Sequence, residues 1–244
     1  MNQLISKTLS EIVNEKFQAA SVFKKYNLDY CRNGKRSLQQ ACKEDNIPVD
    51  KIVEDIKNIY SQKINALDFN SIKLYQLSEY IVYTHHSYIK KEMPQILSYL
   101  EKVSTKHGKR HNELYKISQL FVDLSNELRQ HIHEEETILF PRIKQLEQNG
   151  FEPVPLDINH YQYLQLPIID LEDDDEDVGN IMAEIRTLTN NYTPPDDACT
   201  TFKLLYSSLQ AFEIDLHQYV DLENNILFPK ALILEKELRL LKRN

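Results

Sequence analysis

Glycine is scarce in this chain, and its scarcity narrows the fold class. Only 4 of the 244 residues are glycine, helix-forming residues occur throughout, and few segments alternate β-branched with polar side chains. Sheet proteins depend on such alternation and on glycine at turns and bulges, whereas glycine weakens helices. We therefore expect an all-α protein.

Basic residues, apolar runs and cysteine are also in short supply. The 29 lysines and arginines are outnumbered by 37 acidic residues, which gives a formal net charge of −8. This balance disfavours nucleic acid and anionic membranes as partners. No apolar run approaches the length of a membrane span, and residues 1–6 do not have the pattern of a signal peptide. Three cysteines are too few for a disulfide framework, so we expect a cytoplasmic location.

The sequence divides into a short first part and a long second part. Residues 1–65 are predicted to form a separate small helical domain. Within it, Ser37 is expected to cap a helix, with Gln40 closing a capping box. Residues 65–70 are a candidate linker, and the second domain is predicted to span 71–244.

Four long helical segments are predicted in the second domain. The first crosses Pro94, which is expected to kink it. The second covers about 110–147, the third begins at about Pro167, and the fourth ends near Leu241. Antiparallel helices with short connections predict an up-down four-helix bundle, an architecture that builds metal sites from inward-facing side chains.

A phrase suited to metal binding occurs twice. His131 and Glu135 are four residues apart, so on a helix they lie on one face and can hold a single metal ion. The sequence Ile-Leu-Phe-Pro that follows Glu135 returns after Glu223. The residue four positions before Glu223 is Tyr219, so the second copy has lost its histidine.

An earlier histidine extends the repeat. His86 precedes His131 by nearly the interval that separates Asp175 from Tyr219. His85 adjoins His86, and since only one of two neighbours is expected to face the core, the register favours His86. The sequence thus predicts two half-sites, one of His86, His131 and Glu135 and the other of Asp175, Tyr219 and Glu223.

These candidates also have purely structural explanations. His131 and Glu135 could be an ordinary surface pair one helical turn apart. Tyr219 could pack in the core with its hydroxyl bonded elsewhere. Most of the acidic run at residues 172–177 is expected to be solvated, with Asp175 as the one inward-facing exception.

The cysteines and two further histidines are weaker candidates. Cys31 follows a predicted turn and could be either a reactive thiol or an inert small residue. Cys42 and Cys199 lie among apolar residues, and we expect both to pack in the core. His107 and His111 lie near a predicted helix start, and we expect both to be exposed.

Five blocks of the sequence carry a resemblance to one protein family. They span residues 29–42, 86–94, 131–141, 190–202 and 222–229. The first block contains Asp-Tyr-Cys and ends in Leu-x-x-Ala-Cys, and the last reads Leu-Glu-Asn-Asn-Ile-Leu-Phe-Pro. Together they resemble the iron–sulfur cluster repair di-iron proteins, or RIC proteins, which have a hemerythrin-like C-terminal domain.

The resemblance implies a hemerythrin-like bundle that holds two iron ions with four histidines and two bridging glutamates. By this pattern Glu135 and Glu223 bridge the metals, and His86 and His131 bind one iron. The positions of the other iron's histidines are occupied by Asp175 and Tyr219. The resemblance also implies a role for Cys31 in the stress response, which makes it a candidate catalytic thiol, although Arg32 stands where a second cysteine is usual.

Aspartate and tyrosine would change the chemistry of the second half-site. Both offer oxygen donors, so we expect Asp175 and Tyr219 to bind metal, with a preference for Fe(III) or Mn over Fe(II). A trivalent metal would displace the phenol proton of Tyr219 despite an ordinary pKa of ~10. A single ion, or Mn or Zn in place of iron, is the alternative.

The resemblance implies repair of iron–sulfur clusters damaged by nitrosative or oxidative stress, together with binding or reduction of nitric oxide. The implied partners are iron–sulfur proteins as clients, small diatomic molecules and a second copy of the chain in a homodimer. The alternative is a metal-binding sensor, or a degenerate hemerythrin-like protein with an altered second half-site. The sequence leaves open whether the protein is an enzyme.

Overall fold

A computed structural model describes residues 2–15, 19–26, 28, 30, 34–61, 69–149 and 163–242. Within these ranges the chain consists of helices and turns, with one isolated antiparallel bridge between Thr8 and Ser37. The expected all-α class is confirmed. Cys31 and most of the candidate linker lie outside the described residues. The chain separates into two compact units, Met1–Lys73 together with Asp221–Pro229, and Leu74–Val220 together with Lys230–Asn244.

The first unit is built from five short helices: α1 (Asn2–Ser6), α2 (Leu9–Glu15), α3 (Ala19–Lys25), α4 (Leu38–Glu44) and α5 (Val49–Ser61). They enclose a core of their own, which includes the fully buried residues Leu9, Ile12, Phe23, Leu38, Ile52 and Ile56. The predicted capping box is confirmed. The side chain of Ser37 accepts from the backbone N–H of Gln40, and the backbone N–H of Ser37 donates to the Gln40 side chain.

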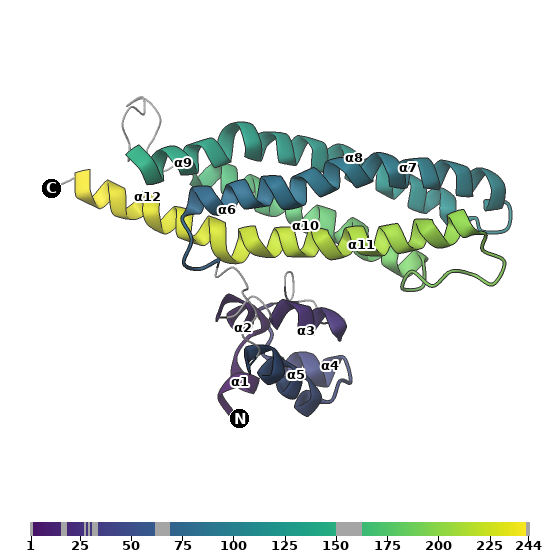
Figure 1. Cartoon of the computed structure of the whole chain (residues 1–244), viewed down its shortest axis with the longest axis horizontal. Coiled ribbons are helices and arrows are strands. Elements are labelled where there is room, and N and C mark those ends of the chain that lie inside the picture. The colour runs from purple at the N-terminus through teal and green to yellow at the C-terminus, as the bar shows by residue number, and fades with distance from the viewer. Residues whose placement is uncertain are drawn as a thin grey trace. The chain divides into compact units, whose positions relative to one another are not determined.

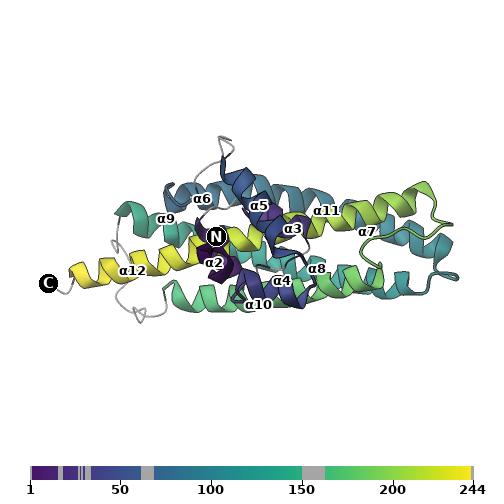
Figure 2. The ribbon, with the colours of Figure 1, turned by 90° about the horizontal axis from the view of Figure 1, so that it is seen from below.

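From Leu74 onward the described chain forms the expected bundle of four long helices, of which three are divided by an irregular turn (Figure 1). The first contains α6 (Leu74–Ile81), η1 (Val82–His86) and α7 (Ser87–His107), and the second contains α8 (Glu113–Glu134), η2 (Glu135–Leu139) and α9 (Phe140–Asn149). The third is α10 (Gln165–Leu188). The fourth contains α11 (Thr200–Leu222), η4 (Glu223–Leu227) and α12 (Phe228–Lys242). Figure 2 shows these helices lying side by side along their length.

The segments η1, η2 and η4 are π turns, which are wider than an α-helical turn because each N–H bonds to the carbonyl five residues earlier. The N–H of Phe140 donates to the carbonyl of Glu135, and the N–H of Phe228 donates to that of Glu223. A proline follows each phenylalanine. Because proline has no N–H and clashes with the carbonyl four residues earlier, a wider turn before it relieves that clash. The second and fourth long helices therefore each contain one such turn.

Pro94 lies inside α7, and the helix continues through it to His107. The irregularity of this helix lies upstream, at η1, where the N–H of Ser87 donates to the carbonyl of Val82. The site of irregularity therefore differs from the one that the proline predicts. It matters for function because η1 ends at His86.

The end of the bundle near α11 departs from expectation. His107 is buried, with its Nε2 3.3 Å from the Sγ of Cys199, and its ring centroid lies 5.4 Å from that of Phe202. The prediction that His107 is exposed is wrong, because the loop before α11 and the first turn of α11 pack against it. Cys199 is half-buried in that loop and does not lie inside a helix.

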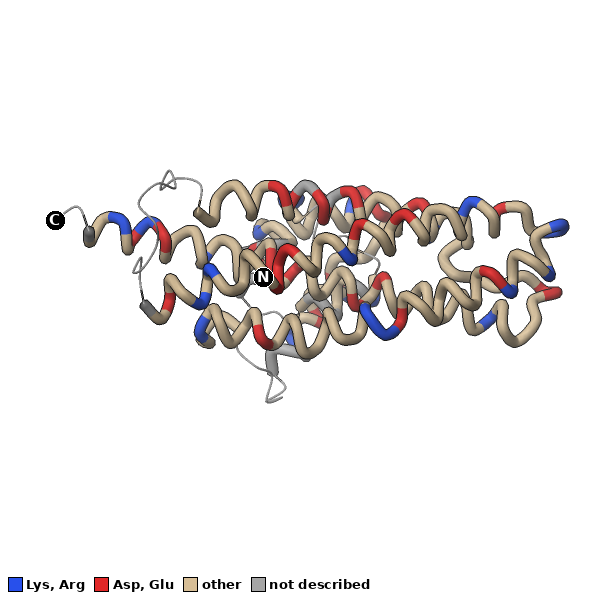
Figure 3. Tube along the Cα trace, turned by 90° about the horizontal axis from the view of Figure 1, so that it is seen from above, with Lys and Arg blue, Asp and Glu red and all other residues tan. Residues whose placement is uncertain are grey.

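Figure 3 marks the charged residues along the Cα trace, where lysines and arginines are interspersed with aspartates and glutamates along the helices. None of the helices in the described ranges combines the length and the apolar character that a membrane crossing requires.

Candidate metal centre

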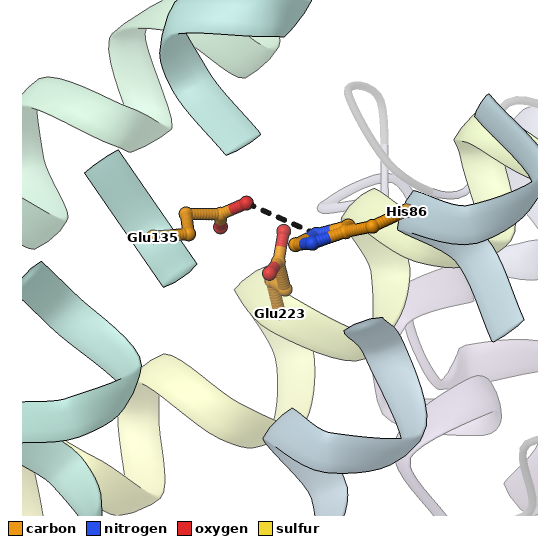
Figure 4. A group of neighbouring side chains, drawn as sticks. All are labelled: His86, Glu135 and Glu223. Atoms are coloured by element: carbon orange, nitrogen blue, oxygen red, sulfur yellow. Dashed lines mark ion pairs between the residues drawn. The ribbon is translucent and has the colours of Figure 1, made fainter. Parts of the chain in front are cut away.

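The donor atoms of the bundle gather in two groups. The His86 group contains His86, Glu135 and Glu223, and the His131 group contains His131, Asp175 and Glu223. Within each group the donor atoms lie within 4.8 Å of one another. Figure 4 shows the first group, in which the carboxylates of Glu135 and Glu223 approach the imidazole of His86. All five side chains are buried, and Asp175 is the most exposed of them at 5%.

Glu135 connects the two groups. Its Oε2 lies 3.3 Å from the Nε2 of His86, and its Oε1 lies 3.4 Å from the Nε2 of His131. Glu223 belongs to both groups. Two carboxylates are therefore shared between two imidazoles that come from different helices, an arrangement that suits a pair of cations bridged by carboxylate oxygens.

This grouping of donor atoms differs from the predicted half-sites. The sequence pairs His86 with His131, but the structure places His131 with Asp175 and leaves His86 with the two glutamates. The repeat follows the order of helices along the chain, whereas the donor groups follow the packing of helices in space. Because α8 packs against both α7 and α10, His131 can face Asp175 on α10.

The π turns place three of the candidate ligands. Glu135 and Glu223 are each the first residue of such a turn, and His86 is the last residue of another. In a regular helix two successive side chains diverge too far for both to face the core. In η1 both do, since His85 is 3% exposed and His86 is fully buried. The expectation that only one of them faces inward is therefore wrong, and π turns frequently mark functional sites.

Tyr219 lies at the His86 group. Its hydroxyl donates to Oε2 of Glu135 over 2.5 Å, the oxygen that also faces His86. The tyrosine is fully buried, and its ring meets that of His86 edge-on with centroids 5.2 Å apart. The structure thus places Tyr219 beside Glu135, where the sequence predicted a half-site shared with Asp175. Its role as a metal ligand stays a prediction.

A carboxylate that sequence reasoning missed orients His86. The Nδ1 of His86 lies 2.8 Å from Oε1 of Glu136, and Lys90 donates to both oxygens of the same carboxylate. Burial alone would raise the pKa of Glu136, but the hydrogen bonds from Lys90 and His86 lower it. An ionised carboxylate only accepts, so Nδ1 carries a proton, and Nε2 is the nitrogen that faces Glu135 and could bind a metal.

The surroundings of His131 favour a positive charge. Asp174 and Asp175 approach its two ring nitrogens, each at 3.6 Å. Burial by itself would lower the pKa of His131, but the neighbouring carboxylates, Glu135 foremost, outweigh burial and raise the pKa well above its ordinary value. Carboxylates that hold a proton on a buried imidazole also stabilise a metal cation at the same place.

The donor set fits a non-haem iron ion. Among the described residues, Nε2 of His86 and both ring nitrogens of His131 are buried without a hydrogen bond of good geometry. Buried polar atoms rarely lack a hydrogen bond, and ligation of an ion is one explanation. Imidazole nitrogen with carboxylate oxygen is a donor combination that suits iron.

The acidic run of α10 behaves as expected where its side chains are described. Asp175 is buried, whereas Glu172, Asp174 and Asp177 are exposed. The prediction of Asp175 as the inward-facing residue is confirmed for these positions. The nearby histidines His133 and His217 take no part in either donor group.

The chain is similar to known proteins over most of its length. Residues 78–231 match the hemerythrin HHE cation binding domain, and residues 5–60 match ScdA_N, a domain of unknown function (DUF542). A protein of Enterobacter sp. (strain 638) named iron–sulfur cluster repair protein YtfE is 31% identical over 225 residues, covering 92% of this chain and 96% of the relative. The protein of the same name from Escherichia coli O81 is 31% identical over 216 residues, covering 88% of this chain and 91% of the relative.

Proposed function

Because this chain belongs to the family of iron–sulfur cluster repair proteins with a hemerythrin HHE cation binding domain, we propose that it holds non-haem iron in its bundle and supports the repair of damaged iron–sulfur clusters. The observation that carries the proposal is the position of Glu135. Its two carboxylate oxygens lie 3.3 and 3.4 Å from the Nε2 atoms of His86 and His131.

Each residue of the centre has a distinct part in this proposal. His86 and His131 supply one imidazole to each ion, and Glu135 and Glu223 are shared between the ions. Asp175 supplies a further carboxylate beside His131. When bound, iron supplies redox chemistry and exchangeable coordination positions. The burial of the protein donors keeps bulk water away and strengthens their electrostatic interactions.

Repair of an iron–sulfur cluster requires a source of iron, and we propose that the client proteins receive it from this centre. Two shared carboxylates offer a simple route for release, because protonation or displacement of a carboxylate oxygen loosens an ion without unfolding the bundle. The acidic outer surface is compatible with a protein client.

Binding of nitric oxide, or of another small diatomic molecule, is a second part of the proposal. An ion at the His86 group would be held by three protein residues. Such an ion could therefore also accept an exogenous ligand. A cytoplasmic location, a homodimer and a role of Cys31 in the stress response stay predictions from the sequence.

Metal content per chain tests the site. Purified protein is expected to contain iron, and His131→Ala and Glu135→Ala are expected to lose most of it. His133→Ala is the matched control, because His133 lies on the same helix as His131, is exposed and belongs to neither donor group. Unchanged iron in both site variants would show that the ligands are misassigned.

A transfer assay tests the function. Iron-loaded protein is incubated with an iron–sulfur enzyme whose cluster has been damaged by nitric oxide, and recovery of the client's activity is followed. We expect faster recovery than with free iron at the same concentration, and none of this gain with Glu135→Ala. A protein that binds metal but gives no gain would be the metal-binding sensor of the alternative interpretation. A protein without metal would be a degenerate member of the family.

A further inference from the structure

The two donor groups share two carboxylates but differ in what else they offer a cation. Glu223 belongs to both groups, and the oxygens of Glu135 face both imidazoles. The His131 group adds the carboxylate of Asp175, whose Oδ1 lies 3.6 Å from the Nε2 of His131. Among the residues that the structure describes, no unshared carboxylate joins the His86 group. With Glu135 counted at both imidazoles, an ion at His131 would meet three carboxylates, whereas an ion at His86 would meet two.

Tyr219 increases this difference by acting on a shared ligand. Its hydroxyl donates to Oε2 of Glu135, the oxygen that faces His86, so part of the electron density of that oxygen is already engaged. The tyrosine ring is held in place, since it stacks on the ring of His85 with centroids 6.4 Å apart and meets that of His86 edge-on. In a close-packed interior such a ring has little room to swing away.

The charged residues around the two imidazoles also make the His131 group the more favourable one for a cation. On the His86 side, Lys90 lies 2.7 Å from Glu136, which in turn contacts Nδ1 of His86. Lys90 therefore balances the negative charge of Glu136 beside this group. On the other side, Asp174 approaches Nδ1 of His131 at 3.6 Å and brings a negative charge. This difference favours a cation at the His131 group.

From these differences we propose that the centre binds metal in a fixed order, first at the His131 group and then, more weakly, at the His86 group. The inference rests on the proposed function, because it takes both groups as metal sites. The order gives the two ions different parts. The ion at the His131 group is retained and holds Glu135 and Glu223 in position, whereas the ion at the His86 group is the cargo that a client can receive.

Manganese titration of the metal-free full-length protein tests the order. Mn(II) bound alone gives a hyperfine-split electron paramagnetic resonance spectrum, whereas two ions that share carboxylates couple magnetically and lose it. With ordered binding, the spectrum of an isolated bound ion grows up to one equivalent and then declines as the second ion binds. We expect the first ion to bind roughly 10–100-fold more tightly than the second, the range that changes around metal ligands produce.

Two variants of the same acidic run identify the first site. Asp175→Asn removes the unshared carboxylate and is expected to weaken the first binding step by about 10-fold or more while leaving the second close to its original value. Asp177→Asn is the matched control, because Asp177 lies on the same helix and is exposed. Circular dichroism verifies that both variants are folded. An unchanged first step in Asp175→Asn would overturn the order proposed.

Colour tests the part given to Tyr219. If its hydroxyl is a hydrogen-bond donor to Glu135, the oxidised iron-loaded protein has no phenolate-to-iron charge-transfer band. A visible band that Tyr219→Phe abolishes would show that the tyrosine binds metal itself. That result would overturn the proposal that the His86 group binds metal more weakly than the His131 group. Two ions of indistinguishable affinity would overturn the order and leave the proposed function standing. A protein that binds no Mn(II) and no iron would overturn the proposed function itself.

Discussion

The two copies of the Glu…Ile-Leu-Phe-Pro phrase have the same backbone and different chemistry. Glu135 and Glu223 are both fully buried, and each begins a π turn closed by the N–H of the following phenylalanine. One helical turn earlier, the first copy has His131 and the second has Tyr219. The phrase therefore encodes the position of a carboxylate. The residue four positions before the glutamate decides whether an imidazole nitrogen is also available to an ion.

The residue that follows each glutamate also differs. Glu136 in the first copy contacts His86 and Lys90, and its counterpart in the second copy is Asn224. The amide of asparagine carries no charge to orient an imidazole. The first copy thus contributes a ligand and the group that orients another helix's ligand, and it is the more specialised of the two.

The largest effect is expected from making the second copy like the first. Tyr219→His removes the hydrogen bond to Glu135 and places an imidazole beside the His86 group. The second metal-binding step should become roughly 10–100-fold tighter, so that the two steps approach each other. Isothermal titration of the metal-free protein with Mn(II) measures both constants. Tyr206→His is a control for the substitution itself, since Tyr206 is also buried on α11 and belongs to neither donor group. A weaker second step in Tyr219→His would show that the histidine cannot reach the metal.

The fold followed from the sequence because its signals are local. The capping box at Ser37, the scarcity of glycine and the helical spacing of apolar residues each act over a few residues, and the structure has the helices they predict. Five of the six predicted ligands gather in the two donor groups, because the repeated phrase marks inward-facing helix surfaces, and their binding of metal stays a prediction. Burial of Asp175 within an otherwise exposed acidic run has the same local origin.

The grouping of those residues did not follow, because it depends on which helices are neighbours. A repeat along the chain pairs His86 with His131, but packing of α8 against α10 brings His131 to Asp175. The π turns were not predicted from the sequence, for a different reason. Their hydrogen bonds skip one more residue than those of an α-helix, and the only local sign is a proline after η2 and η4, which η1 lacks. Burial of His85 beside His86 depends on that turn.

A smaller effect is expected from removing the charge of Glu136, which has an uncharged counterpart, Asn224, in the second copy. Glu136→Gln keeps the size of the side chain but removes the charge that orients His86 and pairs with Lys90. We expect the second metal-binding step to weaken by about 10-fold, the lower end of the range for orienting groups, and the first step to change less. Metal competition with a chromophoric chelator measures both steps. Glu134→Gln is the control, since Glu134 accepts from Gln130 on the outer side of the same helix. An equal loss in both steps would show that Glu136 acts on the whole centre.

The smallest effect is expected from replacing the prolines that follow η2 and η4. This experiment tests whether the backbones of the two copies are equivalent. Pro141 and Pro229 are each the second residue of the helix that follows a π turn. The π turn of η1 forms without a proline, so hydrogen bonding and packing suffice to hold such a turn. Replacing proline by alanine chiefly increases the freedom of the unfolded chain, which lowers the free energy of unfolding by about 0.4–1 kcal/mol. Pro141→Ala and Pro229→Ala should therefore shift the thermal midpoint slightly and by similar amounts, with metal content unchanged. A large shift, or loss of metal, in only one variant would show that its turn depends on proline and that the copies differ in backbone as well as in chemistry.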